Sequence, residues 1–268
     1  MSARNLPNQK NRSETALISD ADNTLWDTDR IYAETQLWLL SQVEEAIGKR
    51  CAEDQRLDFV RRIDQGLAQK HHRGLRYPVV LLANALEAAL RGEAVPIAIR
   101  TAMGNQVAGQ QPLPAKKLGD EFEARIKFHP PLRNGVDSGL ERLHHQGVRV
   151  VVATEGSADT CKQRLTHWGL ERFVTHVISA PKTVELFLRI ANLVHLPTHD
   201  CFAVGDQLDR DIAPARTAGC RTIYFPGGFN PVWAPKVDQI QPDHVISSFD
   251  EVSKIIGQAR QAPAAHQL

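Results

Sequence analysis

The chain has 268 residues, of which 42% are hydrophobic and 24% charged, so it is long enough for one large domain or two modest ones and too apolar for general disorder. Its 32 Lys and Arg residues nearly balance 31 Asp and Glu residues, and the formal net charge is +1. This balance argues against non-specific nucleic-acid binding, which needs a basic excess.

The chain ends and the cysteines bear on the compartment. Residues 1–14 are polar and lack the apolar segment of a secretory signal, and the longest apolar stretch, Val79–Leu90, is too short to cross a membrane. The four cysteines are widely spaced, with no C-x-x-C pair, which disfavours a disulfide framework or a thiolate zinc site. We therefore expect a soluble cytoplasmic protein with no membrane partner, and flexible tails at residues 1–14 and 258–268.

The first predicted element is a short buried strand. Ala16–Ser19 is an apolar run that ends abruptly in the polar Asp20–Asn23, a pattern typical of a strand that leads into a loop. Residues 28–129 then follow a helical pattern throughout, with apolar residues repeating every three or four positions. Helices are expected at residues 33–47, 57–67 and 79–90 and, after breaks at Gly104, Pro112 and Pro114, in a last segment that ends at Phe128.

Beyond residue 130, predicted strands and helices alternate. Strands are expected at residues 148–153, 176–179, 201–204, 221–225 and 244–246, and helices at 136–145, 158–168, 183–193 and 212–218. Such alternation implies right-handed crossovers and a parallel sheet covered on both faces. The first strand must join this sheet, since it has no other partner. We thus predict a doubly wound, Rossmann-like α/β core at residues 15–27 and 130–257, with residues 28–129 inserted as an all-helical cap.

Polar side chains follow four of the predicted strands. They are Asp20 and Asp22, then Thr154, then Lys182, and finally Asp206, Asp209 and Asp211. In an open α/β sheet the carboxyl ends of the strands share one edge, where sites form. Clustered carboxylates repel one another unless a cation lies among them, and oxygen ligands favour Mg²⁺ over zinc. A metal, an ammonium and a hydroxyl together suit a phosphoryl group.

Each of these residues also has an ordinary explanation. Asp and Asn are common turn formers, Asp206 and Asp211 could cap the next helix, and Lys182 could be a solvated surface lysine. Their joint occurrence in this order favours phosphoryl-transfer chemistry. Zinc binding by histidine is not expected, because Pro197 interrupts the one pair with ligand-like spacing, His195 and His199.

Taken together, these residues resemble the motifs of the haloacid dehalogenase-like hydrolase superfamily. Asp20-Ala21-Asp22-Asn23-Thr24-Leu25 is similar to its first motif, D-x-D-x-T-[LV], and Thr154 and Lys182 are similar to its second and third. Gly205–Asp211 is similar to its fourth motif, G-D-x-x-x-x-D. The resemblance covers about residues 17–252, and the helical insertion lies where the family has its first type of cap.

The resemblance implies a phosphatase that hydrolyses a small phosphorylated metabolite through an aspartyl-phosphate intermediate. Asp20 would be the nucleophile. Asp22 would protonate the leaving oxygen and later deprotonate the attacking water. Thr154 and Lys182 would bind the non-bridging phosphoryl oxygens, which take no part in the bond that breaks. The dehalogenases of the superfamily lack an acid at the position of Asp22, so its presence favours phosphate chemistry.

The resemblance also implies a Mg²⁺ cofactor. Asp20, Asp206 and the backbone carbonyl of Asp22 would hold the ion, and Asp211 would orient the metal site or Lys182. Asp209 adds a further carboxylate to the fourth motif and is not expected to be a ligand.

Three alternatives remain open, and the sequence fixes neither the substrate nor the oligomeric state. A phosphomutase of the same fold would have to retain a bisphosphate and exclude water. A phosphonate hydrolase would need a cap lysine, for which Lys49 and Lys70 are nominal candidates. A non-catalytic binding protein on this scaffold predicts the loss of Asp20, Asp22 or Lys182, and all three are present.

The densest basic stretch of the chain lies in the predicted cap, at Lys70–Tyr77. We expect Gly74 to permit a turn there, and Arg73 or Arg76 to bind an anionic group on the leaving portion of the substrate. The alternative is a solvated helix end, where cations complement the helix dipole.

Overall fold

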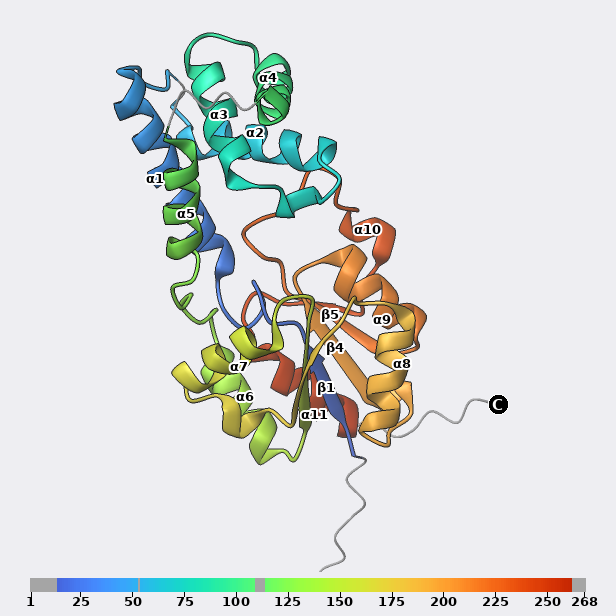
Figure 1. Ribbon diagram of the computed structural model, residues 1–268. Helices are drawn as coiled ribbons and strands as arrows, with labels where there is room; N and C mark the ends of the chain where they lie inside the picture. Colours follow the sequence, from blue (N-terminus) through green and yellow to red (C-terminus); the bar gives the residue numbers. More distant parts are fainter. Residues whose placement is uncertain (1–13, 53, 109–113, 262–268) are drawn as a thin grey trace, which may run out of the picture. The chain divides into compact units, whose positions relative to one another are not determined.

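The computed structural model describes residues 14–52, 54–108 and 114–261 (Figure 1). The chain divides into two compact units, with boundaries after Asp27 and after Pro130. Most of the predicted tails, residues 1–13 and 262–268, lie outside the described residues.

The first unit contains a parallel sheet of six strands. They are β1 (Ala16–Ser19), β2 (Arg149–Thr154), β3 (His176–Ser179), β4 (Cys201–Gly205), β5 (Arg221–Tyr224) and β6 (His244–Val245). The strand order is β3-β2-β1-β4-β5-β6. Ser19 at the end of β1 pairs with Val152 on one side and with Val204 on the other. The carboxyl ends of these three strands therefore meet at one edge, and the predicted doubly wound α/β fold is confirmed.

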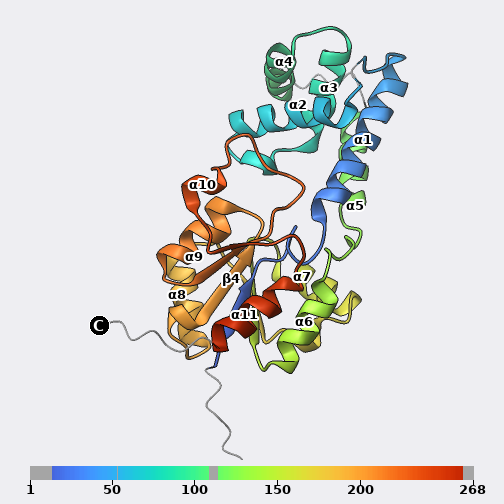
Figure 2. The ribbon, with the colours of Figure 1, turned by 180° about the vertical axis from the view of Figure 1, so that it is seen from behind.

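Helices cover both faces of this sheet (Figures 1 and 2). One face packs against α6 (Val136–His145), α7 (Ala158–His167) and α11 (Glu251–Gln261), and the other against α8 (Val184–Leu193) and α9 (Ala213–Thr217). Leu17 belongs to the first of these apolar clusters, and Ala16 and Ile18 belong to the second. Because successive strand side chains point to opposite faces, the apolar run of β1 is buried on both.

Shorter helices complete this unit. They are η2 (Glu171–Phe173), η3 (Thr198–Asp200), the π-helical turn η4 (Leu208–Ile212) and α10 (Val237–Ile240). The helix α11 was not predicted from the sequence, although Val252 and Ile256 are spaced to face the core and are fully buried. This helix includes residues 258–261, which were expected in the C-terminal tail.

The second unit is entirely helical within the described residues. Its elements are α1 (Thr28–Ile47), α2 (Arg56–Lys70), η1 (Gly74–Arg76), α3 (Val79–Leu90), α4 (Val95–Ala108) and α5 (Ala115–Arg125). The predicted break at Gly104 is wrong, because this residue lies inside α4. One helical glycine costs about 1 kcal/mol, which the burial of Ile99 and Ala102 on the same helix outweighs. Pro114 does precede a helix, but α5 ends at Arg125 rather than at Phe128.

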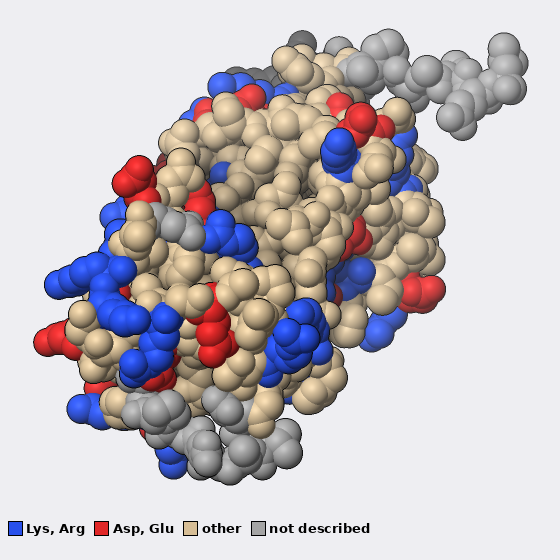
Figure 3. All heavy atoms as spheres, turned by 90° about the horizontal axis from the view of Figure 1, so that it is seen from above, with Lys and Arg blue, Asp and Glu red and all other residues tan. Residues whose placement is uncertain are grey.

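The surface and the cysteines add two observations. On the face that Figure 3 shows, Lys and Arg side chains are interspersed with Asp and Glu. All four cysteines are free thiols. Across the described ranges, none of the helices combines the length and the apolar character that a membrane span requires.

Candidate active site

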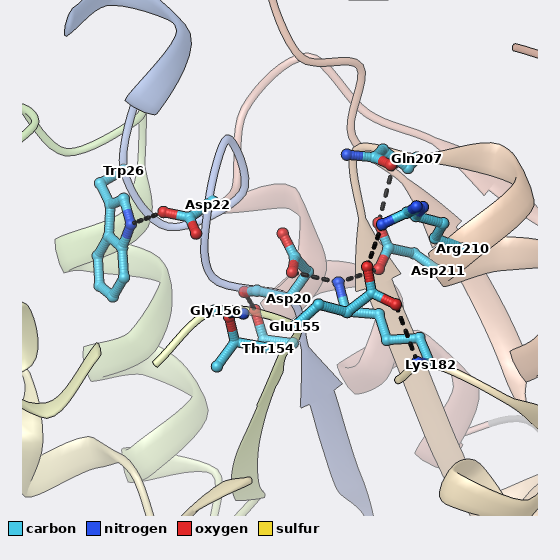
Figure 4. Close-up of polar contacts among 11 residues, drawn as sticks. Asp20, Asp22, Trp26, Thr154, Glu155, Gly156, Lys182, Gln207, Arg210 and Asp211 are labelled. Atoms are coloured by element: carbon cyan, nitrogen blue, oxygen red, sulfur yellow. Dashed lines mark hydrogen bonds and ion pairs between the residues drawn. The ribbon is translucent and has the colours of Figure 1, made fainter. Parts of the chain in front are cut away.

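The predicted site residues of the first unit gather at the carboxyl edge of the sheet (Figure 4). The backbone amide of Asp20 donates to the carbonyl of Val204 over 2.9 Å, which fixes this residue directly beyond β1. Thr154 is the last residue of β2, and Lys182 lies between β3 and α8. The structure thus brings Lys182 into contact with Asp20, which lies 162 residues earlier in the chain.

Lys182 joins two carboxylates at the centre of the site. Its ammonium donates to Asp20 Oδ1, and to Asp211 Oδ1 over 2.5 Å, with all three side chains buried. Burial alone would lower the pKa of Lys182, but the two carboxylates raise that pKa well above its usual value. The lysine therefore stays charged and offsets part of the negative charge around Asp20.

The remaining carboxylate oxygens suit a divalent cation. Asp20, Asp206 and Asp211 each place one oxygen within 4.8 Å of the others. Asp211 is engaged through both oxygens, since Oδ2 accepts from the amide of Gln207 over 2.9 Å. By contrast, Asp20 Oδ2 and Asp206 Oδ2 are buried and have no hydrogen-bond partner among the described residues. A buried hydrogen-bond acceptor without a donor lowers the stability of the fold. Carboxylate oxygens are also the ligands that Mg²⁺ prefers.

The titration of these carboxyl groups supports the same conclusion. Burial is the main cause that raises the pKa of Asp20 to about 7 and that of Asp206 to about 9, and Lys182 opposes both shifts. Asp211 adds to the rise at both residues by repulsion. A cluster whose charged form is this unfavourable is stabilised by a cation. Asp209, in contrast, is exposed and lies outside the cluster.

Asp22 is held by two donors that were not predicted from the sequence. Its Oδ1 accepts from the indole Nε1 of Trp26 over 2.8 Å and from Nη1 of Arg164 over 2.7 Å. Trp26 directly follows the first motif and could have been noticed as an indole close to a key carboxylate. Arg164, on α7 and 142 residues away in the chain, carries no local signal of this contact.

The segment after β2 also contributes a contact network. The amide of Gly156 donates to Thr154 Oγ1 over 3.0 Å, which uses an acceptor site of the hydroxyl and keeps its O–H as a donor. Glu155 accepts from the backbone amide of Lys182 over 3.2 Å and forms an ion pair with Arg210. Glu155 therefore ties together the segments that follow β2, β3 and β4, a role indicated in the sequence only by its place beside Thr154.

Arg133 connects two loops next to the acidic cluster. Its guanidinium donates to the backbone carbonyls of Asn23, of Phe225 over 3.2 Å and of Pro226 over 2.7 Å. It also lies 3.6 Å from the centroid of the Phe225 ring. These contacts fix the loop after β1 against the loop after β5. The periodicity of the sequence does not reveal contacts between segments so far apart in the chain.

The two arginines predicted to bind substrate belong to the helical unit. Arg73 precedes the turn η1 and Arg76 is its last residue, and both are exposed. Gly74 has a φ of +55°, so the expected turn does use its conformational freedom. The role of Arg73 and Arg76 in substrate binding stays a prediction.

Comparisons with known proteins place these residues in a family context. A family model for haloacid dehalogenase-like hydrolases matches residues 15–219. A phosphoglycolate phosphatase from Nitrosococcus oceani is 30% identical over 146 residues, covering 52% of this chain and 62% of that protein. One from Pectobacterium atrosepticum is 27% identical over 207 residues, covering 66% of this chain and 85% of that protein. Among solved structures, a magnesium-bound hydrolase of this family from Bacillus subtilis has a TM-score of 0.60 at 20% identity, covering 91% of this chain and 98% of that one.

Proposed function

The chain belongs to the haloacid dehalogenase-like hydrolases, and from this membership we propose that it is a Mg²⁺-dependent phosphatase that acts through an aspartyl-phosphate on Asp20. The observation that carries the proposal is the arrangement around Lys182. Its ammonium bridges Asp20 and Asp211, while one buried oxygen of Asp20 and one of Asp206 have no partner among the described residues. This arrangement supports a nucleophilic carboxylate that works beside a cation on an anionic substrate.

In the first half of the reaction, Asp20 attacks phosphorus while the bond to the leaving oxygen breaks. Asp22 donates a proton to that oxygen, so the leaving group departs as an alcohol rather than as an alkoxide. Lys182 and the hydroxyl of Thr154 bind the non-bridging oxygens of the phosphoryl group, and they stabilise the charge that spreads over these oxygens.

In the second half, water attacks the phosphorus of the aspartyl-phosphate. Asp22, now a carboxylate, accepts a proton from that water, and the bond between phosphorus and Asp20 breaks. Inorganic phosphate forms, and both aspartates return to their starting states. Asp20, Asp206 and the backbone carbonyl of Asp22 would hold Mg²⁺, which supplies positive charge that screens the phosphoryl oxygens from the carboxylates.

We propose a small phosphorylated metabolite with an anionic leaving portion as the substrate. Two relatives are phosphoglycolate phosphatases, and a phosphorylated carboxylic acid fits the exposed basic stretch around Arg73 and Arg76. The test is the release of inorganic phosphate from a panel of sugar phosphates, nucleotides and phosphorylated acids, with Mg²⁺ and with EDTA. Release that requires Mg²⁺ supports the proposal. Rearrangement of a sugar phosphate without release would favour a phosphomutase, and inactivity on every compound would overturn the proposed function.

Gly227→Ala is expected to weaken Mg²⁺ binding roughly tenfold to a hundredfold, the usual cost of disturbing the surroundings of a metal ligand. A Cβ at this position would lie 2.7 Å from Asp206 Oδ2 and 3.3 Å from Asn23 Cβ, so the carboxylate or the loop must move. Calorimetric titration with Mg²⁺ measures the effect, and Gly228→Ala, at an exposed position in the same loop, is the matched control. Equal Mg²⁺ affinity in both variants would show that Asp206 Oδ2 is not a ligand.

Arg73→Ala or Arg76→Ala should lower kcat/KM on an anionic substrate such as 2-phosphoglycolate roughly tenfold or more, since a hydrogen bond to a charged group is worth about 1.5–3 kcal/mol. An aryl phosphate has an uncharged leaving portion and so lacks the second anionic group. Its hydrolysis should therefore change little. Arg100→Ala removes an exposed arginine of α4 and serves as the control. Small and parallel losses on both substrates would leave the basic stretch as a solvated helix end.

A further inference from the structure

The carboxylate of Asp22 is held on one side by two buried donors. Oδ1 accepts both from Trp26 Nε1 and from Arg164 Nη1, at 2.8 and 2.7 Å (Figure 4 shows Asp22 turned to the indole). Trp26 is fully buried and Arg164 is 9% exposed. The guanidinium also lies 5.6 Å from the centroid of the indole ring, so the two donors support each other.

The other oxygen of Asp22 faces the end of β2. A Cβ added to Gly156 would lie 3.5 Å from Asp22 Oδ2 and 3.2 Å from Thr154 Oγ1. Oδ2 and the threonine hydroxyl therefore border the same small space. The two oxygens of this carboxylate are thus directed to different surroundings, Oδ1 to the buried donors and Oδ2 to the space beside the hydroxyl of Thr154.

Asp22 needs such support because its side chain is 42% exposed on a loop, while its proposed proton transfers need close alignment. A misplacement of about 1 Å in a reacting group can cost on the order of 10²-fold in rate. A guanidinium is charged at every working pH, and its planar donors fix direction as well as distance.

We infer that Arg164, together with Trp26, is a positioning residue that holds Asp22 Oδ1 and directs Oδ2 at the leaving oxygen and then at the attacking water. The inference rests on the proposed function. Neither residue touches the reacting atoms; both act through Asp22. A purely structural role is the rival explanation, because a buried arginine must be paired, and this pair also links α7 to the loop after β1.

Leaving-group dependence separates the two explanations. An alkyl phosphate needs protonation of its leaving oxygen, whereas p-nitrophenyl phosphate needs little. Arg164→Met keeps the apolar stem and removes the donor. The loss in kcat/KM should therefore be roughly tenfold or more larger on the alkyl phosphate than on the aryl phosphate. Arg164→Lys should recover part of the loss on the alkyl phosphate. Trp26→Phe removes the indole donor and part of the ring volume but keeps an aromatic side chain, and it should change the two substrates in the same unequal way, by a smaller factor.

Arg260→Met is the matched control. Arg260 is a partly buried arginine of the same unit that donates to the carbonyl of Gln146 over 2.6 Å and to Thr15 Oγ1 over 3.0 Å, at the amino end of β1. Its loss should lower stability in urea unfolding and affect both substrates equally. The same equal effect in Arg164→Met and in Trp26→Phe would overturn the inference.

The design also distinguishes failure of the inference from failure of the proposed function. A wild-type protein that releases phosphate from neither substrate overturns the proposed function itself. A second outcome is that the wild type is active and Asp22→Asn loses more activity on the alkyl phosphate than on the aryl phosphate, whereas Arg164→Met does not. That outcome overturns only the positioning role. If Arg164→Met fails to fold, Trp26→Phe and Arg164→Lys decide the question.

Discussion

Substituting Asp20 by Asn is expected to abolish phosphate release, lowering kcat by roughly 10⁴-fold or more. The amide has nearly the same size and keeps the packing beyond β1, but it is a poor nucleophile and a weaker metal ligand. We expect the free energy of unfolding to change little, since Lys182 keeps Asp211 as a partner and the buried cluster loses one negative charge.

The control for this variant is Asp209→Asn, the same substitution at an exposed aspartate of the fourth motif. It should retain wild-type activity. Both variants are assayed for phosphate release after circular dichroism has shown that they fold. Near-wild-type activity in Asp20→Asn, with contaminating phosphatase excluded, would remove Asp20 as the nucleophile.

Asp22→Asn is expected to lower the rate roughly 10²–10⁴-fold on substrates with poor leaving groups, which is the usual contribution of general acid–base catalysis. An aryl phosphate should lose less in the first half of the reaction, since its leaving oxygen needs little protonation. The second half still needs a base, so phosphorylated enzyme should accumulate on the aryl substrate.

Rapid-quench measurement of phosphoenzyme formation and decay checks this prediction. Equal losses in phosphoenzyme formation for good and poor leaving groups would remove the acid role from Asp22. Unchanged decay of the phosphoenzyme would remove the role of base.

The sequence predicted the part of the fold and site that depends on local pattern. Strand ends are marked by short apolar runs followed by polar residues, and in a parallel sheet those ends must share an edge. Asp20, Thr154, Lys182 and Asp206 could therefore be placed together before any contact was known. The helical pattern of residues 28–129 likewise predicted an inserted helical unit.

What the sequence did not reveal depends on packing between distant segments. The helix α4 continues through Gly104 because tertiary burial outweighs a small local cost. The contacts of Arg164 with Asp22 and of Arg133 with Asn23 join residues that are 142 and 110 positions apart. Neither arginine differs in its local sequence from the many that face solvent.

Residue type and spacing alone did not separate the acidic residues of the fourth motif; only the family resemblance assigned them different roles. The sequence offered Asp206, Asp209 and Asp211 within six positions, with nothing in composition to separate them. In the fold, Asp206 keeps an unpartnered buried oxygen, Asp211 is committed to Lys182 and Gln207, and Asp209 is exposed. Asp209 and Asp211 lie in the π-helical turn η4, which the periodicity of the sequence did not indicate, and Asp206 precedes it.

Trapping the covalent intermediate shows directly whether the reaction passes through an aspartyl-phosphate on Asp20. The wild-type protein is mixed with Mg²⁺ and a phosphate ester that it hydrolyses, and the reaction is quenched in acid during turnover. The protein is then digested and analysed by mass spectrometry. We expect one phosphoryl group, on the peptide that contains Asp20, and no such group when Asp20→Asn is treated in the same way. A phosphoryl group on a different residue, or none in an Asp22→Asn protein that has released its aryl alcohol in a burst, would contradict the account.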